Sequence, residues 1–373
     1  MRIGIDARFY GSGGKGLGRY TEKLIANLEK LDKQNQYFIF LGRANFGSYQ
    51  PQNANFKKVL APYLHYSWQE QVFFPHLLNK YGLDLVHFLH FNVPFFYRRP
   101  YIVTIHDLIY SAAGRQGGTR NSLIYQLKKI IYRIILRNLT SLARRIITIS
   151  EFSRKQIVEY RPFLKDKITI VYEGVESLTN QVAEAPEVAI ERRLEEKKFF
   201  LYIGNAYPHK NLSRLLESFY QLVSVKNDIY LVLVGELDVN YQHLKRNADH
   251  LGLEDKVYFS GRLKEKELVW LYQHAYSYIV PSLIEGFGLP ALEAMFYGSP
   301  VLSSNFGPMP EIYGNAAIYF DPTNIRDMYR TMLRILDEKK LRPRMVAQGF
   351  EQIKKFSWEK MAREMINIYL NTK

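Results

Sequence analysis

Two glutamates eight positions apart, Glu285 and Glu293, mark the stretch of the sequence with the most chemical content. Between them lie a Gly-Phe-Gly turn and a predicted helix opened by Pro290, which suits a first helical turn because the N–H it lacks would be unpaired there. The N–H groups and dipole of a helix N-terminus attract anions such as a diphosphate. Glu285 can face such a ligand, and Glu293 can accept hydrogen bonds from ribose hydroxyls. The backbone candidates for the diphosphate are Gly286, Phe287, Gly288 and Leu289.

A glycine-rich loop follows the first predicted strand. Gly11, Gly13 and Gly16 form a literal G-x-G-x-x-G, the spacing of a dinucleotide-binding turn. The first glycine does not follow the strand directly, and the second predicted strand does not end in a carboxylate, so two features of an NAD site are missing. The lysine of a phosphate-binding P-loop is also missing after Gly16. The pattern instead predicts a loop that offers backbone N–H groups to an anion or a sugar. Its candidate residues are Gly13, Gly14 and Gly16.

Short apolar stretches alternate with helical patterns along the chain, which favours an α/β fold with mainly parallel sheets. Predicted strands in the first half are Arg2–Asp6, Tyr37–Leu41, Leu85–Phe88, Tyr101–Ile105, Arg145–Ile149 and Ile168–Tyr172. Those in the second half are Phe199–Ile203, Tyr230–Val234, Val257–Phe259, Tyr278–Val280, Pro300–Ser303 and Ala317–Phe320. Helices are predicted at Asn211–Val225, Lys264–His274, Pro290–Tyr297 and Ser357–Tyr369. We expect two doubly wound domains whose ligands bind outside the carboxyl ends of the strands.

The composition excludes several kinds of site. The chain of 373 residues has no cysteine, which excludes disulfides and thiolate metal sites. No two aspartates stand two positions apart, so an Asp-x-Asp metal motif is also missing. We identify no secretory signal and no uncharged stretch long enough to span a bilayer. These features predict a cytoplasmic protein.

Positive charge is concentrated in the first half of the chain. Residues 1–180 carry 26 Lys and Arg against 12 Asp and Glu, a net of +14, which leaves +1 of the total of +15 for residues 181–373. Residues 123–145 have the pattern of an amphipathic helix with Lys129, Arg133, Arg137 and Arg144 on one stripe. This helix could lie on an anionic membrane, or it could be a core helix with a solvated basic face. Both interpretations remain open.

Together these motifs resemble the family 4 glycosyltransferases, retaining enzymes of the GT-B fold. The resemblance rests on the E-x7-E pair, on IGNAYPHKNLSRLLESF and TIHD, and on TISEFSRKQI and VYEGV. The opening segment IDARFYGSGGKGLGRYT is similar to that of a subgroup rich in bacterial polysaccharide mannosyltransferases. The resemblance implies two Rossmann-like domains facing each other across a cleft.

The same resemblance implies a division of labour along the chain. Residues 1–176 would form the acceptor or membrane-side domain, 177–198 a linker, and 199–355 the nucleotide-sugar-binding domain. Residues 356–373 would form a helix that crosses back to the N-terminal domain.

The resemblance also implies roles for residues of the C-terminal half. Lys210 would bind the nucleotide diphosphate, Glu285 the hydroxyls of the donor sugar, and Glu293 the ribose. Asn205 stands where many members of the family carry an arginine, and the backbone near Leu263 would support the nucleobase. In the N-terminal half, His106 would lie near the sugar, with Asp107 orienting His106 or the acceptor. The pair His87 and His90 is interpreted as structural.

The expected reaction moves a hexose, with mannose from GDP-mannose as the first choice, to a hydroxyl of a growing, lipid-linked surface glycan. We expect no metal, no other cofactor and no nucleic-acid partner. The enzyme would act at the inner face of the cell membrane as a peripheral protein. A UDP-glucose-type donor is one alternative, and a non-catalytic protein that binds an anionic surface is another. An NAD oxidoreductase is disfavoured by the missing acidic residue.

Overall fold

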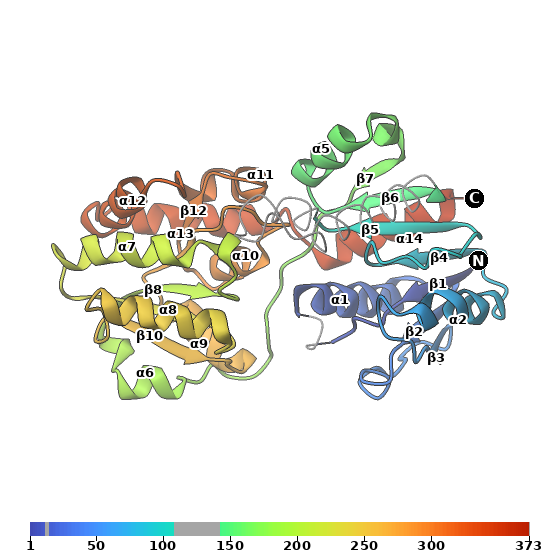
Figure 1. The fold of residues 1–373 in the computed structure, drawn as a ribbon, viewed down its shortest axis with the longest axis horizontal. Coiled ribbons are helices and arrows are strands. Elements are labelled where there is room, and N and C mark those ends of the chain that lie inside the picture. The colour runs from blue at the N-terminus through green and yellow to red at the C-terminus, as the bar shows by residue number, and fades with distance from the viewer. Residues whose placement is uncertain (12–14, 108–141, 373) are drawn as a thin grey trace. The chain divides into compact units, whose positions relative to one another are not determined.

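The computed structural model describes residues 1–11, 15–107 and 142–372. Gly13 and Gly14 of the predicted loop, and most of the predicted basic helix at 123–145, therefore lie outside the described residues. The contacts within the chain divide it into two units, one of residues 1–174 with 357–373 and one of residues 175–356 (Figure 1). The C-terminal helix α14 (Trp358–Asn371) thus belongs to the same unit as the N-terminus.

The first unit contains a seven-stranded parallel sheet in the order β3-β2-β1-β4-β5-β6-β7. The strands are β1 (Arg2–Asp6), β2 (Gln36–Leu41), β3 (Phe56–Leu60), β4 (Leu85–Phe88), β5 (Tyr101–Ile105), β6 (Arg145–Thr148) and β7 (Ile168–Ile170). The helices are α1 (Lys15–Leu31), α2 (Trp68–Asn79), α5 (Glu151–Tyr160), the 3₁₀ helix η2 (Pro162–Lys167) and α14. The strand order reverses between β1 and β4, and this is where doubly wound sheets bind ligands.

The second unit contains a six-stranded parallel sheet in the order β10-β9-β8-β11-β12-β13. The strands are β8 (Lys198–Ile203), β9 (Ile229–Val234), β10 (Val257–Gly261), β11 (Ser277–Val280), β12 (Val301–Ser304) and β13 (Ala317–Phe320). The helices are α6 (Glu187–Glu191), α7 (Leu212–Val223), α8 (Val239–His250), α9 (Glu265–His274), α10 (Leu289–Phe296), α11 (Met309–Tyr313), α12 (Ile325–Asp337) and α13 (Leu341–Ile353), with 3₁₀ turns η3 (Leu194–Glu196), η4 (Pro208–Lys210) and η5 (Gly314–Ala316).

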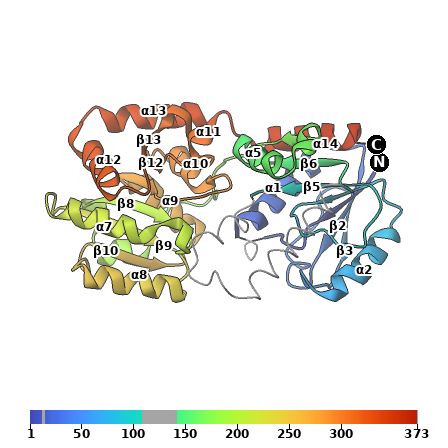
Figure 2. The ribbon, with the colours of Figure 1, turned by 45° about the horizontal axis from the view of Figure 1, so that its top comes forward.

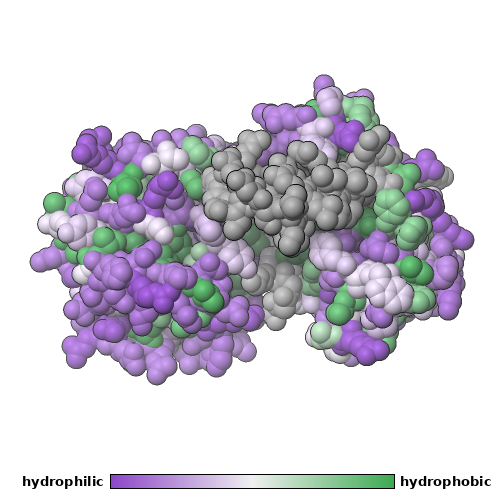
Figure 3. All heavy atoms as spheres, in the orientation of Figure 1, coloured by the Kyte–Doolittle hydropathy of each residue, from purple (hydrophilic) through white to green (hydrophobic). Residues whose placement is uncertain are grey.

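Helices pack on both sides of this second sheet. Helix α7 contacts both α8 and α12, and α10 contacts both α9 and α13 (Figure 2). The central strands are apolar on both faces, as expected for a covered parallel sheet. Hydrophilic side chains cover most of the second unit on the face drawn in Figure 3.

The fold confirms the predicted α/β class and all twelve predicted strands, whose ends differ by at most two residues. It adds one strand that the sequence reading missed, β3. Lys57 and Lys58 interrupt the apolar pattern there, and β3 tolerates them because it lies at the edge of the sheet. Residues 177–198, predicted as a linker, contain α6 and η3 and belong to the second unit, where Leu194 is fully buried.

Candidate functional site

Lys210 and Glu285 meet at the point of the second sheet where the strand order reverses. Lys210 follows β8 and Glu285 follows β11, and these two strands are neighbours. The Lys210 ammonium donates to both carboxylate oxygens of Glu285, at 2.8 and 2.7 Å. The hydroxyl of Ser282 donates to Glu285 Oε1 at 2.6 Å. Both charged side chains are 15% exposed, so the pair is shielded from bulk water but reachable by a ligand.

The buried side chain of Asn211 joins the two loops that carry this pair. Its amide donates to the backbone carbonyls of Pro281, at 3.0 Å, and Pro322, at 2.7 Å. Its backbone has the left-handed conformation, with φ of 61°, which asparagine tolerates better than most residues. The N–H of Leu283 also donates to the His209 carbonyl at 2.8 Å. The sequence reading missed this role of Asn211, for which its position just before a helix was the available signal.

His209, beside Lys210, adds no second charge. Burial lowers the pKa of His209, and the charge of Lys210 lowers it further, although Glu285 opposes the shift. His209 is therefore neutral near pH 7, and the charge of Lys210 is the one that faces Glu285.

The turn before α10 depends on glycine. Gly288 precedes the helix with φ of 83°, and a Cβ at this position would lie 1.9 Å from the hydroxyl oxygen of Tyr313. That hydroxyl donates to the Gly288 carbonyl at 2.9 Å. Pro290 occupies the first turn of α10, as predicted. Phe287 is buried and packs edge-on against Phe356, so only its backbone can serve a ligand beside Gly286 and Leu289.

The other donor-side candidates lie around the same sheet edge. Glu293, on α10, is 5% exposed and accepts a 2.9 Å hydrogen bond from the hydroxyl of Tyr272. The side-chain oxygen of Asn205 accepts from the N–H of Tyr207 at 3.2 Å, which orders the loop after β8. Leu263 lines an open hollow of about 1290 Å³ beside β10.

In the first unit, His106 follows β5 and is held through both ring nitrogens. Its Nε2 lies 3.1 Å from the carbonyl oxygen of Leu89, and its Nδ1 lies 3.4 Å from Glu173 Oε1. The ring of Tyr20 packs edge-on against it. The sequence reading proposed Asp107 as the orienting carboxylate and missed Glu173, although Glu173 lies within the quoted VYEGV motif.

Gly16 was predicted to lie in the glycine-rich loop. The structure places it in the first turn of α1, at the helix N-terminus.

His87 was predicted to be structural. It is fully buried between the hydroxyls of Tyr369 and Thr104, and each hydroxyl oxygen lies 2.8 Å from a ring nitrogen of His87. Burial, aided by the charge of His106, lowers the pKa of His87 to about 3, so this histidine is a neutral core residue. Within the described ranges, no three His, Asp or Glu side chains gather as a metal site.

Two family models match the chain in succession. Residues 14–177 match the model described as Glycosyltransferase Family 4, and residues 185–352 match the model described as Glycosyl transferases group 1. The chain is 33% identical to O-antigen chain mannosyltransferase B of Escherichia coli over 235 residues, which are 61% of this chain and 60% of that protein. The chain thus matches less than two thirds of that relative's length.

Solved structures share the fold over almost the whole chain. Sucrose-phosphate synthase from Thermosynechococcus elongatus superposes with a TM-score of 0.76 at 18% identity, over 99% of this chain and 98% of that one. Anabaena HepE in complex with UDP-glucose superposes with a TM-score of 0.74 at 14% identity, over 99% of this chain and 98% of that one. No helix among the described residues is long and apolar enough to cross a membrane.

Proposed function

Because this chain belongs to the family 4 glycosyltransferases and has their GT-B fold, we propose that it transfers a hexose from a nucleotide sugar to a glycan hydroxyl. The observation that carries this proposal is the Lys210–Glu285 pair at the strand-order reversal of the second sheet. The pair lies in loops that Asn211 joins, and the glycine turn at Gly288 leads from it into α10. A cation, a carboxylate and a helix N-terminus together suit a ligand that is a diphosphate at one end and a polyol at the other.

In this proposal the donor divides the Lys210–Glu285 pair between its two ends. The diphosphate takes the ammonium of Lys210 and the backbone N–H groups from Gly286 to Leu289. Glu285, still oriented by Ser282, accepts hydrogen bonds from the hexose hydroxyls. Glu293 and the loop near Leu263 serve the ribose and the base.

The chemical step breaks the bond between the anomeric carbon and the diphosphate oxygen, and a new bond forms to the acceptor oxygen. Negative charge grows on the departing diphosphate, where Lys210 and the helix N-terminus stabilise it without a metal ion; preorganised donors of this kind each contribute on the order of a few kcal/mol. We propose that the acceptor attacks on the face from which the diphosphate leaves, so the anomeric configuration is retained. The acceptor proton passes to the leaving diphosphate oxygen, so the step needs no dedicated base.

The similarity to an O-antigen mannosyltransferase favours mannose as the hexose and GDP-mannose as its donor. A lipid-linked surface glycan is the matching acceptor. UDP-glucose remains the alternative donor, because the structurally similar HepE was solved with it.

A thermal-shift panel tests donor binding. The unfolding temperature is measured with GDP, UDP, ADP and NAD and with the matching nucleotide sugars, each with and without Mg²⁺. We expect GDP to stabilise the protein without metal, by about 2.7 kcal/mol at a hundred times its dissociation constant. The variant Lys210→Ala should lose this stabilisation, whereas Lys226→Ala, which breaks an exposed ion pair of the same unit, should keep it. A shift with NAD alone would contradict the proposal.

A further inference from the structure

A buried ion cluster occupies the strand-order reversal of the first sheet, the counterpart of the place that Lys210 and Glu285 occupy in the second. Arg8 follows β1 and donates to both carboxylate oxygens of Asp6, at 2.8 and 2.7 Å. Arg8 Nη2 also lies 2.6 Å from Oε1 of Glu70, which is in the first turn of α2. The guanidinium of Arg8 lies over the ring of Phe74. All three charged side chains are at most 7% exposed. Burial alone would raise the pKa of Asp6, but the charge and hydrogen bonds of Arg8 outweigh it and lower that pKa.

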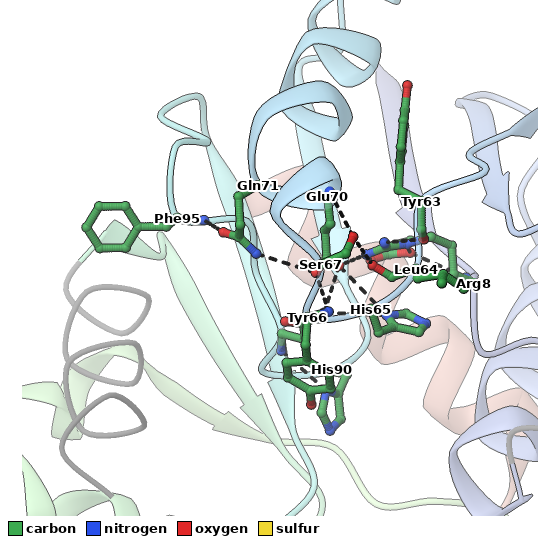
Figure 4. Close-up of polar contacts among 12 residues, drawn as sticks. Arg8, Tyr63, Leu64, His65, Tyr66, Ser67, Glu70, Gln71, His90 and Phe95 are labelled. Atoms are coloured by element: carbon green, nitrogen blue, oxygen red, sulfur yellow. Dashed lines mark hydrogen bonds and ion pairs between the residues drawn. The ribbon is translucent and has the colours of Figure 1, made fainter. Parts of the chain in front are cut away.

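This cluster holds the backbone of the loop between β3 and α2. Arg8 donates to the carbonyl of Tyr63 at 3.2 Å, and Glu70 accepts from the N–H of Tyr66 at 2.7 Å. The side chain of Asn92, from the loop after β4, donates to Glu70 at 2.7 Å. Figure 4 shows Arg8 and Glu70 side by side at the first turn of α2, with Tyr66 close by. Two loops at the carboxyl edge of the sheet are therefore fixed to one buried carboxylate.

The fixed loop and the first residue of α2 carry exposed aromatic groups, and the backbone is strained at Tyr66. Tyr66 has φ of 63°, a conformation that costs on the order of 1–3 kcal/mol for a non-glycine residue and is concentrated at functional sites. Its side chain is 62% exposed, and the side chain of Trp68 is 67% exposed. His65 stacks on Phe9, with ring centres 3.8 Å apart and planes 9° apart. Tyr66 and Trp68 therefore present aromatic surface that a ligand can reach.

The charge pattern identifies the kind of ligand. Residues 59–79 contain no lysine or arginine, although the first 180 residues have 26 of them. The one carboxylate of this stretch, Glu70, is buried beneath the loop. An anionic lipid surface requires cations, which this stretch lacks. A neutral sugar ring requires an apolar ring face and nearby hydrogen-bonding groups, and the loop supplies both.

We propose that Phe9, His65, Tyr66 and Trp68 form a subsite for a neutral hexose ring of the acceptor glycan, with Arg8 and Glu70 as positioning residues that hold the loop. The inference rests on the proposed function, because it assigns the acceptor of that reaction to this edge of the first sheet. The aromatic rings contact the apolar faces of the sugar, and His65 supplies a polar group beside them.

Tryptophan fluorescence tests the subsite without any catalytic step. The chain has three tryptophans, and Trp270 and Trp358 are 9% and 2% exposed, so acrylamide quenching reports mainly on Trp68. We expect mannotriose to lower the quenching constant of the wild-type chain and to have no effect on the Trp68→Phe variant. Vesicles of anionic phospholipid provide the comparison. Protection by vesicles but not by mannotriose would overturn the proposal in favour of a lipid partner, and protection by neither would overturn it as well.

Kinetics test the subsite in the reaction. The variant Tyr66→Ala should raise the acceptor KM about five- to tenfold, the size of a lost aromatic contact of about 1–1.4 kcal/mol, while Tyr66→Phe should restore it. Glu70→Gln should raise the acceptor KM more than it lowers kcat. Stabilisation by nucleotide should not change in any of these variants. Phe163→Ala, which removes a ring that is 61% exposed elsewhere in the first unit, is the matched control.

The two proposals fail in different ways. An unchanged acceptor KM in Tyr66→Ala and Trp68→Ala, with active transfer, would overturn the subsite and leave the proposed function standing. Absence of transfer from every nucleotide sugar would contradict the proposed function, and the quenching experiment would still decide whether the loop binds a sugar.

Discussion

At the level of single residues, the Lys210–Glu285 pair shows how one contact can prepare two separate ligand sites. Each partner satisfies the charge of the other, with N–O distances of 2.7–2.8 Å and 15% exposure of both side chains. Breaking a partly buried pair leaves one charge without compensation. The donor that we propose offers an anion to Lys210 and hydroxyls to Glu285, so it separates the pair without leaving either charge unsatisfied.

Substitution of Lys210 and substitution of Glu285 should each slow the reaction, for different reasons. We expect Lys210→Ala to lower kcat by about 10²–10³, the usual cost of losing one preorganised donor to developing negative charge. Glu285→Gln keeps the shape of the side chain but removes the charge that orients Lys210 and Ser282, and it should also lower kcat. Initial rates of nucleoside diphosphate release measure both effects. Near-normal turnover in both variants would show that the pair is structural.

Gly288 should tolerate no side chain. A methyl group there would lie 1.9 Å from the Tyr313 hydroxyl oxygen on a backbone with φ of 83°, so Gly288→Ala should destabilise the protein by about 1–3 kcal/mol and weaken nucleotide binding. Urea unfolding and nucleotide thermal shifts measure the two effects. Gly47→Ala is the control, because its Cβ would meet nothing within 4 Å and its φ is not positive. Equal stability of the two variants would refute the steric argument.

At the level of elements, the sequence predicts those features that are determined locally. Strands with continuous apolar stretches, and the helix opened by Pro290, were predicted closely because their patterns reflect their own burial. The edge strand β3 was missed because Lys57 and Lys58 are acceptable only once its place at the sheet edge is known. The contacts of Asn211 with Pro281 and Pro322 could not be predicted, because they join segments 70 and 111 positions apart.

Local sequence motifs identified some residues of the site but not the contacts between them. Lys210 and Glu285 could be nominated from their motifs, but their direct contact could not. Glu173 was overlooked because its neighbour in space, His106, comes from a different strand. The arrangement of Arg8 with Glu70 likewise depends on a loop whose path no local pattern specifies.

The stability of the folded protein should fall at acidic pH. His87 hydrogen-bonds to Tyr369 of α14 and has a pKa of about 3 because it is buried. The pKa of His90 is also lowered to about 3, mainly by burial. Because the unfolded chain takes up a proton at each histidine below pH 6.5 and the folded chain does not, stability should fall as the pH drops from 6.5 towards 3.

The slope of this fall is roughly 1.4 kcal/mol per pH unit for each histidine. Urea midpoints measured at pH 7 and pH 5 should show the loss, and His87→Gln should show a smaller one because it removes one titrating group. A pH-independent midpoint over this range would contradict the assignment of His87 and His90 as neutral in the folded chain.

At the level of the whole molecule, charge is distributed unevenly between the two halves of the sequence. The first 180 residues carry a net +14 and the remainder +1, so long-range attraction to an anionic surface acts mainly on the half that we propose to receive the acceptor. A lipid-linked acceptor would be held at such a surface. The uncharged loop around Tyr66 would then receive the sugar, while basic residues elsewhere in this half meet the lipid headgroups.

Vesicle sedimentation tests this proposal. We expect the protein to bind vesicles that contain anionic phospholipid at low ionic strength and to be released as salt rises, since screening shortens the Debye length to about 8 Å at 0.15 M. Neutral vesicles should not bind it. Binding that is insensitive to salt, or absent from anionic vesicles at low salt, would refute peripheral electrostatic attachment.

Product NMR reports whether the Lys210–Glu285 site transfers a hexose with retention and without a metal. The protein is incubated with GDP-mannose, an oligomannose acceptor and EDTA, and the one-bond C1–H1 coupling of the new mannosyl residue reports its anomeric configuration. We predict GDP release with an α-linked product, the configuration of the donor, and loss of both signals in Lys210→Ala. A β-linked product, a strict need for added Mg²⁺, or full activity in Lys210→Ala would show that this site does not act by metal-independent, retaining transfer.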